Sequence, residues 1–195
     1  MQKRKSMLMV AAALVVGSLA LAGCTTTGDK PDTAATSASK GSAIDASVDA
    51  TLTRLYSTVK GSRELVSKSR GVLVFPEVIQ AGFIVGAQSG NGALRIGGDT
   101  VGYYNTSSLS VGLQAGAQSK AIVFLFMTQS ALDEFRHSDG WAAGAGASVA
   151  LVKVGANGAV DTTTATAPVQ VVVMTNTGLM GDVSINGTKV TKLKL

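Results

Sequence analysis

Residues 120–127 have the sequence KAIVFLFM, and this stretch decides the fold class. After its lysine the run is continuously apolar and short, which is typical of a central strand buried on both faces. Residues 109–118 (LSVGLQAGAQ) come just before it and alternate apolar with small or polar side chains, which predicts a half-buried strand. The chain around residue 120 is therefore expected to form a sheet.

Further strands are expected on both sides of this stretch, with one helix among them. Thr128 can cap a helix that contains Ala131, Leu132 and Phe135 and stops near residues 138–140. Asn186-Gly187 lies between two apolar-alternating segments and predicts a two-residue hairpin turn. The other predicted strands are Val72–Phe75, closed by Pro76, and residues 141–152 (WAAGAGASVALV) and 169–174 (VQVVVM).

Glycine recurs within the strand-patterned segments, where it weakens a strand unless curvature, a bulge or a close approach of backbones requires it. Residues 86–89 and 116–119 both read GAQS. Strands rich in glycine and alanine favour a strongly curved antiparallel sheet or a small barrel with a narrow interior. The glycines concerned are Gly82, Gly86, Gly112, Gly116, Gly144 and Gly146.

An amphipathic helix is expected before the sheet. Apolar residues recur there at spacings of three and four, at Ile44, Val48, Leu52, Leu55 and Val59. Ser42 and Asp45 resemble a capping box at its start, and Gly61 separates it from a second short helix over residues 62–69. The predicted fold class is α+β: an N-terminal helical segment packed on a curved antiparallel sheet or small β-barrel, with one inserted helix.

Residues 1–24 predict export and lipid anchoring. Lys3, Arg4 and Lys5 precede a short apolar run, which is typical of a secretory signal peptide and too short for a comfortable bilayer span. Residues 21–24 (LAGC) resemble the bacterial lipobox, in which the cysteine receives a diacylglyceryl group and, after cleavage, an N-acyl chain. The alternative is an ordinary signal peptide with an incidental cysteine. The expected parts are a signal peptide at 1–23, a lipidated flexible tether at 24–42, and one domain at 43–195.

The mature chain would be weakly basic. Loss of three of the 17 basic residues and none of the 12 acidic ones lowers the formal net charge from +5 to +2, which argues against nucleic-acid binding. Residues 25–42 contain no large apolar side chain, as expected for a tether. Thr25 stands where an inner-membrane retention aspartate would be, so by resemblance to that sorting pattern we expect the periplasmic leaflet of the outer membrane.

Catalytic and metal-binding patterns are missing from the sequence. Cys24 is the only cysteine and His137 the only histidine, which does not suffice for an ordinary zinc site. Asp133 and His137 would share a helix face, where a surface ion pair or a charge at the C-terminal end of the helix is the more common outcome, and a base with its orienting carboxylate is the alternative. The chain has no nucleophile elbow and no phosphate-binding loop. We therefore expect no enzyme, no cofactor and no metal.

A basic cluster in the N-terminal part is the candidate binding surface. Between residues 54 and 70 only Glu64 opposes five cations, and such a cluster is attracted to an anionic bilayer. A solvated helix face is the alternative. The candidate lipid-binding residues are Arg54, Lys60, Arg63, Lys68 and Arg70.

Five blocks in order resemble the SYLF domain family, also known as a lipid-binding or actin-binding domain. They are GVLVFP at 71–76, AGF.VG at 81–86, S.G.QAGAQ at 110–118, ALDEF at 131–135 and GLMGDVS at 178–184. The resemblance implies a lipid-binding module whose contacts lie in its N-terminal helical part. Eukaryotic members are associated with phosphoinositides and actin, whereas bacterial members are often short lipoproteins.

The expected function is therefore that of a non-catalytic lipoprotein of the outer membrane that binds anionic phospholipid head groups of the phosphoinositide type. The alternative is an envelope structural or protein-interaction lipoprotein without a specific lipid ligand.

Overall fold

The computed structural model describes residues 33–82, 85–111, 116–143, 149–152, 160, 167–175, 178–179 and 187–195 of the chain. The signal peptide, Cys24 and residues 24–32 of the expected tether lie outside the described residues, as do residues 183–186 of the expected hairpin. Residues 32–195 form one compact unit.

The described residues form three helices and a nine-stranded sheet. The helices are α1 (Thr33–Thr58), α2 (Ser62–Lys68) and α3 (Gln129–His137). The strands are β1 (Gly71–Gly82), β2 (Val85–Ile96), β3 (Asp99–Val111), β4 (Gly116–Phe126), β5 (Trp141–Ala142), β6 (Val149–Leu151), β7 (Val169–Thr175), β8 (Gly178–Leu179) and β9 (Lys189–Leu193).

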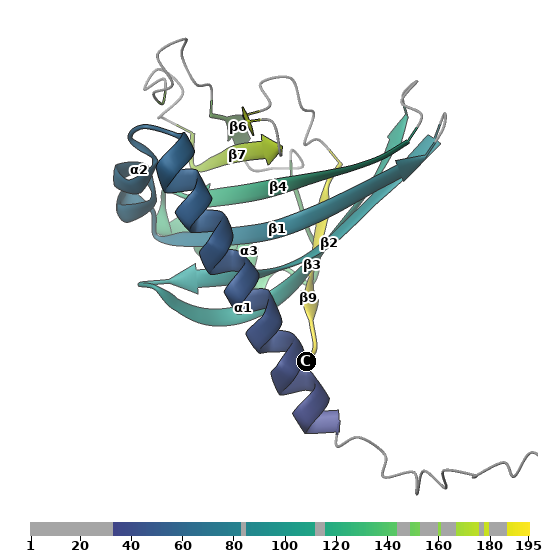
Figure 1. The fold of residues 1–195 in the computed structure, drawn as a ribbon. Coiled ribbons are helices and arrows are strands. Elements are labelled where there is room, and N and C mark those ends of the chain that lie inside the picture. Colours follow the sequence, from purple (N-terminus) through teal and green to yellow (C-terminus); the bar gives the residue numbers. More distant parts are fainter. Residues whose placement is uncertain are drawn as a thin grey trace, which may run out of the picture. The chain divides into compact units, whose positions relative to one another are not determined.

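The sheet is curled and has the order β5-β9-β3-β2-β1-β4-β7-β6, with β8 paired to β7 (Figure 1). Every pairing is antiparallel except that of β6 with β7, which is parallel. The predicted α+β class with a helix on a curved sheet is confirmed. In the described strands the curled sheet keeps two ends, at β5 and β6, so the open sheet and not the closed alternative is present.

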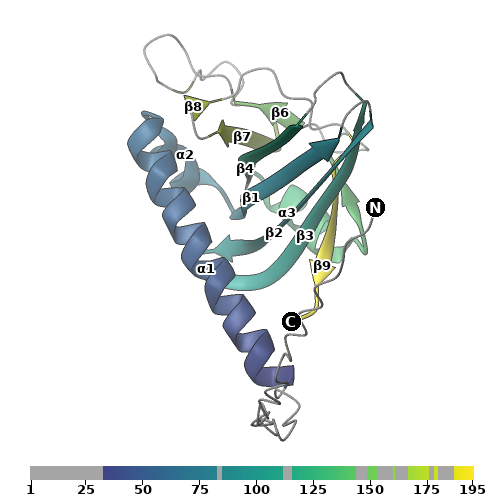
Figure 2. The same ribbon diagram turned by 45° about the vertical axis from the view of Figure 1, so that its right-hand side comes forward.

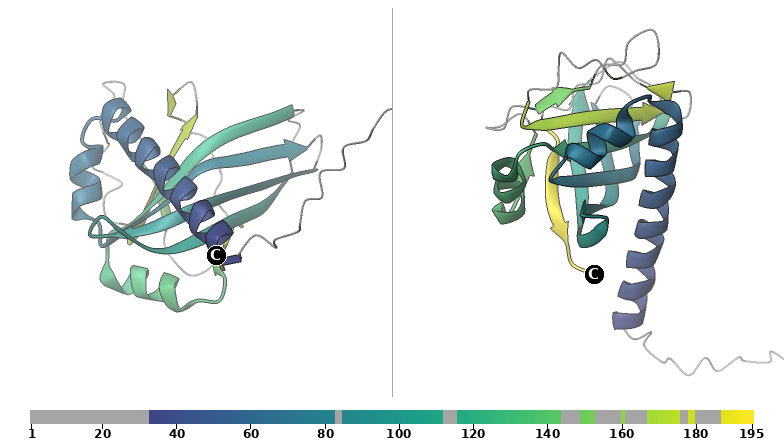
Figure 3. Two further views of the ribbon diagram at one scale, coloured as in Figure 1. Left: turned by 60° about the horizontal axis from the view of Figure 1, so that its bottom comes forward. Right: turned by 90° about the vertical axis from the view of Figure 1, so that its left-hand side faces the viewer.

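Helices cover the sheet on both sides (Figure 3). α1 and α2 lie on what we call the outer face, where Val48 and Leu55 pack against Val74 and Val123. α3 lies on the opposite, inner face, which carries the aromatic core. Trp141 there meets Phe124 edge to face with ring centroids 5.6 Å apart, and both belong to the buried core.

α1 is longer than expected. It begins at Thr33, so residues 33–42, expected in the flexible tether, are helical, and Ser42 donates to the Ala38 carbonyl within the helix where a cap was predicted. Alanines are the best helix formers, and a helix that is already packed extends at little cost. Gly41 is buried, and a Cβ on it would lie 2.9 Å from the Tyr103 hydroxyl oxygen, so this part of α1 also meets the sheet.

β1 continues through Pro76, where the sequence predicts that it ends. The registers of β1 with β2 and with β4 both shift around this proline, so Pro76 lies in a bulge and leaves the ladder intact on either side. Opposite the bulge, Gly90 and Gly92 of β2 lie so close to β1 that a Cβ would be 2.4 Å and 2.0 Å from backbone carbonyl oxygens. These two glycines permit the sharp curl.

Two predicted strands are divided in the structure. β3 ends at Val111 and β4 begins at Gly116, so the alternation over residues 109–118 spans the crossover between them. Leu109 is 79% exposed, so this alternation does not mark one buried face. Residues 141–152 supply β5 and β6, at opposite ends of the sheet. Gly112, Gly144 and Gly146 lie outside the described residues.

The two GAQS segments flank the same part of β1. Gln80 pairs with Gln88 of β2 on one side and with Gln118 of β4 on the other. In the same way, Ala81 pairs with the alanine and Gly82 with the glycine of each GAQS segment. Three neighbouring strands thus carry matching residues at matching levels near their ends.

Candidate functional site

α1 is fixed to the β2–β3 hairpin by polar contacts. The Asp45 carboxylate accepts hydrogen bonds from Thr100 Oγ1 at 2.6 Å and from Tyr103 Oη at 2.8 Å. Arg95 lies between both acidic residues of α1, 2.8 Å from Asp49 and 3.5 Å from Asp45. The hydrogen bond to Asp45, together with burial, raises the pKa of Tyr103. These contacts set the position of α1 over the sheet.

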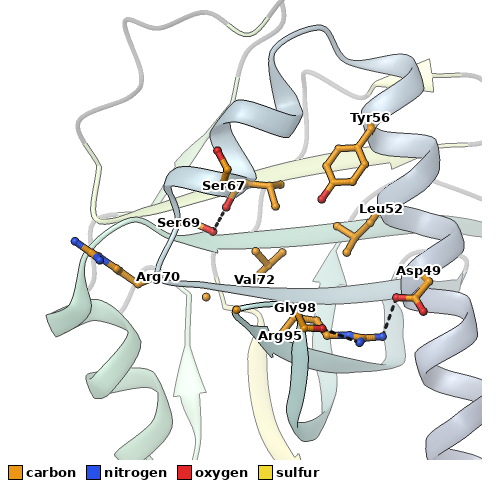
Figure 4. Close-up of a pocket in the computed structure, with 12 residues that line it drawn as sticks. Asp49, Leu52, Tyr56, Ser67, Ser69, Arg70, Val72, Arg95 and Gly98 are labelled. Atoms are coloured by element: carbon orange, nitrogen blue, oxygen red, sulfur yellow. Dashed lines mark hydrogen bonds and ion pairs between the residues drawn. The ribbon is translucent and has the colours of Figure 1, made fainter.

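A cavity of about 250 Å³ lies between α1, α2 and the turn that joins β2 to β3 (Figure 4). Its apolar side is formed by Leu52 of α1, Val66 of α2 and Val72 of β1. Tyr56 projects into it from α1, as Figure 4 shows. The remaining lining residues are Asp49, Ser67, Ser69, Arg70, Gly71, Arg95, Gly97 and Gly98.

The rim of this cavity is polar and basic. Arg70 is exposed and extends outward from the rim, on the segment between α2 and β1 (Figure 4). Arg63 of α2 lies over the Tyr56 ring, with its guanidinium carbon 4.3 Å from the ring centroid. Arg70 thus lies at the rim of a cavity with an apolar side, and Arg63 stacks on a residue that lines it. This arrangement suits an amphiphile with an anionic head.

The structure separates the five basic residues predicted from the sequence. Arg70 lines the cavity and Arg63 stacks on a residue that lines it. Lys68 is exposed and donates to Glu64 at 2.6 Å, which lowers the pKa of that carboxyl, so its charge is already compensated. Lys60 is exposed, and Arg54 is partly buried, with a buried Nε that has no hydrogen-bond partner among the described residues. Neither Lys60 nor Arg54 lines the cavity.

Arg95 is the cavity residue that the sequence did not indicate. Its side chain is 16% exposed, and it donates to the Gly98 carbonyl at 3.1 Å as well as to Asp49. Its partners on α1 lie 46 and 50 positions away in the sequence, beyond the reach of any local pattern. Because Arg95 is engaged by two carboxylates, it shapes the cavity and leaves anion attraction to Arg63 and Arg70.

A second cavity, of about 420 Å³, lies between the first half of α1 and strands β1 to β3. Its lining includes Ile44, Glu77, Ile79 and Asn105, and none of the described residues that line it is basic. Glu77 would repel an anion there, so this cavity is the weaker candidate for a lipid head group.

The described residues contain no cluster of three or more potential metal ligands. His137 is exposed on α3, and its Nδ1 lies 2.7 Å from the Asp133 backbone carbonyl oxygen. The Asp133 carboxylate accepts from Gln129, and His137 lies in the last turn of α3. Of the two expected arrangements, the position at the C-terminal end of the helix is present and the ion pair with Asp133 is not. Among the described helices none has the length and apolarity to cross a bilayer.

Comparison with known proteins identifies the C-terminal part of the chain. Residues 107–194 match the family described as Ysc84, Las17-binding protein actin regulator. This match confirms the resemblance to the SYLF domain family over those residues. No functionally curated protein matches the sequence.

Proposed function

Because this chain carries the Ysc84 (SYLF) domain, whose family is associated with lipid and actin binding, we propose that it binds anionic phospholipid head groups at the cavity between α1 and α2. One observation carries the proposal: an apolar cavity wall of Leu52, Val66 and Val72 ends at a rim that bears Arg70. The cavity residues precede residue 107, so their role rests on this geometry.

The chemistry of a phospholipid fits such a site. The phosphodiester is an anion, and the guanidinium groups of Arg70 at the rim and of Arg63 over Tyr56 attract it and can donate paired hydrogen bonds to its oxygens. The glycerol backbone and the start of an acyl chain are apolar and match the cavity wall. Arg63, held over Tyr56, keeps its charge near the surface at little loss of conformational freedom.

Flotation with vesicles tests the proposal. The unlipidated chain of residues 32–195 should bind vesicles that contain phosphatidylglycerol and ignore pure phosphatidylcholine vesicles, and salt should weaken the binding. This chain starts before α1, whereas a start at residue 43 would remove the first ten residues of the helix. A basic side chain near an anionic bilayer contributes about 1 kcal/mol, so R63Q/R70Q should weaken binding about thirtyfold.

The matched control is R136Q/K194Q, which removes the same charge from exposed positions away from the cavity. E64Q/K68Q should have little effect, since it removes the exposed Lys68–Glu64 pair and leaves the net charge unchanged. Equal losses in R63Q/R70Q and R136Q/K194Q would show that net charge alone attracts the chain to vesicles, and would refute a head-group site at this cavity.

We further propose that Cys24 is acylated and holds the domain at the periplasmic leaflet of the outer membrane. The proposal is supported by the lipobox-like residues 21–24 and by the absence of aspartate at position 25. An acyl anchor would keep the cavity within reach of the bilayer, so a weak head-group site would act at high effective concentration.

A protein-binding function in the envelope is the second candidate. The matched family is described as binding the protein Las17, and two large apolar side chains are exposed on the outer face. Leu109 is 79% and Ile79 51% exposed. A chain that ignores anionic vesicles, and whose partner is released by Leu109→Ser, would favour this function.

A further inference from the structure

The inner face of the sheet changes from apolar to polar at one level. Val78 and Ile122 end the aromatic core on β1 and β4, and the next inner-face positions toward the strand ends are polar. Four of them form a row across neighbouring strands in the order β3, β2, β1 and β4. The row consists of Ser108, Gln88, Gln80 and Gln118, each in register with the next.

Gln88 is the buried member of this row and is incompletely satisfied. Its side chain is 7% exposed, and its Nε2 donates to Ser108 Oγ. Its Oε1 is buried without a hydrogen-bond partner in the described part of the chain. Buried carbonyl oxygens nearly always accept a hydrogen bond, so Gln88 Oε1 offers an acceptor to a donor from another molecule.

Lys120 lies beside the row, one inner-face position closer to the core. It is in register with Val78 on one side and with Thr175 on the other, and it is partly buried. Its Nζ lies 3.5 Å from Gln80 Oε1, and none of the ion pairs in the described residues includes it. Burial lowers the pKa of Lys120. A cation withdrawn from water without a counter-charge favours an anionic ligand.

We propose that this inner polar row binds an oxyanion that carries a neighbouring hydroxyl group. Lys120 holds the anionic oxygen, and the hydroxyl donates to Gln88 Oε1. The remaining amides of the row, which can both donate and accept, bind the other oxygens of the ligand. Glycerol phosphate has both groups, as a free metabolite-sized anion or as the head group of phosphatidylglycerol.

This site is separate from the cavity at Arg70. The row lies on the inner face near the ends of β1 to β4, whereas α1 and α2 cover the outer face (Figure 2). Ser108, Gln118 and Lys120 belong to residues 107–194, the part that matches the Ysc84 family. The inference therefore does not depend on lipid binding at the first cavity.

Calorimetric titration of the 32–195 chain with three probes tests the site. Glycerol 3-phosphate should bind, inorganic phosphate should bind about tenfold more weakly because it cannot supply the alcohol hydroxyl, and glycerol should not bind. K120M should lose about tenfold or more in affinity for glycerol 3-phosphate, and Q88L should lose the preference over phosphate. K194M, which removes an exposed lysine elsewhere, should bind like the wild type.

Nitrogen-15 NMR of the wild-type chain tests the same contact without a variant, so it does not depend on whether Q88L folds. The side-chain amide signals of Gln88 should shift on titration with glycerol 3-phosphate and remain in place with glycerol. Unchanged affinity in K120M, no binding by the wild type, or equal affinity for glycerol 3-phosphate and phosphate would each overturn the proposal.

Vesicles distinguish the two sources of the ligand. If the row binds a lipid head group, glycerol 3-phosphate should compete with phosphatidylglycerol vesicles for the chain in flotation, and K120M should weaken vesicle binding. If the row binds the free anion, K120M should lose its binding of glycerol 3-phosphate and retain its binding of vesicles. R63Q/R70Q should retain glycerol 3-phosphate binding in both cases, which separates this site from the cavity on the outer face.

Discussion

Replacing Asp45 by alanine should loosen α1 from the β2–β3 hairpin. The change removes two hydrogen bonds to a carboxylate, at 2.6 Å and 2.8 Å, and the longer of two ion pairs of Arg95. Hydrogen bonds to charged groups contribute about 1.5–3 kcal/mol each when buried, and the Asp45 side chain is 30% exposed. Discounted for this exposure, the loss should be about 2 kcal/mol.

Thermal unfolding measures this loss. For a chain of this size 1 kcal/mol corresponds to about 2–4 °C, so Asp45→Ala should lower Tm by about 4–8 °C. Asp49→Ala is the matched control, because it removes a single ion pair of a carboxylate that is 67% exposed. Such pairs contribute at most about 1 kcal/mol, so its effect should be the smaller one.

A double-mutant cycle locates the effect. Asp45→Ala and Tyr103→Phe remove the two ends of one hydrogen bond, so the double variant should be more stable than the sum of the single changes predicts, by about 1 kcal/mol. If Asp45→Ala costs no more than Asp49→Ala, or if the cycle shows no coupling, then polar contacts do not hold α1 in place and apolar packing alone does.

Three further predictions concern ionisation and anchoring. Because the pKa of Tyr103 is raised in the folded chain, the wild type should lose stability relative to Tyr103→Phe as the pH rises above the ordinary tyrosine value of 10.0; Tm at pH 9 and pH 11 measures this. Because burial lowers the pKa of Lys120, Lys120→Met should be more stable than the wild type at pH 7, and this gain should shrink as the pH rises from the lowered pKa towards 10.5. Equal Tm curves for the two chains would contradict this. Cys24→Ala should remove the mature protein from the detergent phase in Triton X-114 partitioning, and continued partitioning after signal removal would exclude acyl anchoring.

Local patterns in the sequence predict the elements that local interactions create. α3 has the expected cap, with Thr128 Oγ1 accepting from the Ala131 amide at 3.3 Å, and β4 and β7 are the expected buried strands. The apolar spacing of α1 correctly marks the side that packs on the sheet. Each of these features depends on residues within a few positions of one another.

Features that depend on distant parts of the chain could not be predicted from local sequence patterns. The start of α1 is one of them, since residues 33–42 lack large apolar side chains and Gly41 packs under Tyr103, 62 positions later. The bulge at Pro76 is another, because its partners Gly90 and Gly92 come from the next strand. The apolar pattern of one strand does not indicate which other strand its backbone will approach closely.

The same limit applies to the candidate sites. Counting charges along the sequence selects Arg70, which lines the cavity, and Arg63, which stacks on a residue that lines it, because both are close in sequence to other basic residues. It could not separate them from Lys68, whose charge is compensated, nor find Lys120, whose significance comes from burial on the inner face. In the sequence, a lysine at the start of an apolar run cannot be distinguished from a solvated lysine at the end of a strand.

The matching GAQS segments have a consequence for how the chain folds. Near its end β1 meets two partners with the same four residues in the same register, so local pairing alone cannot decide which strand takes which side. Chain connectivity can decide it, because β2 follows β1 directly and closes the shorter loop, which is faster than closing the longer one to β4. A circular permutant that begins at β2 would lose this kinetic preference, and should fold more slowly through species in which the two strands have exchanged places.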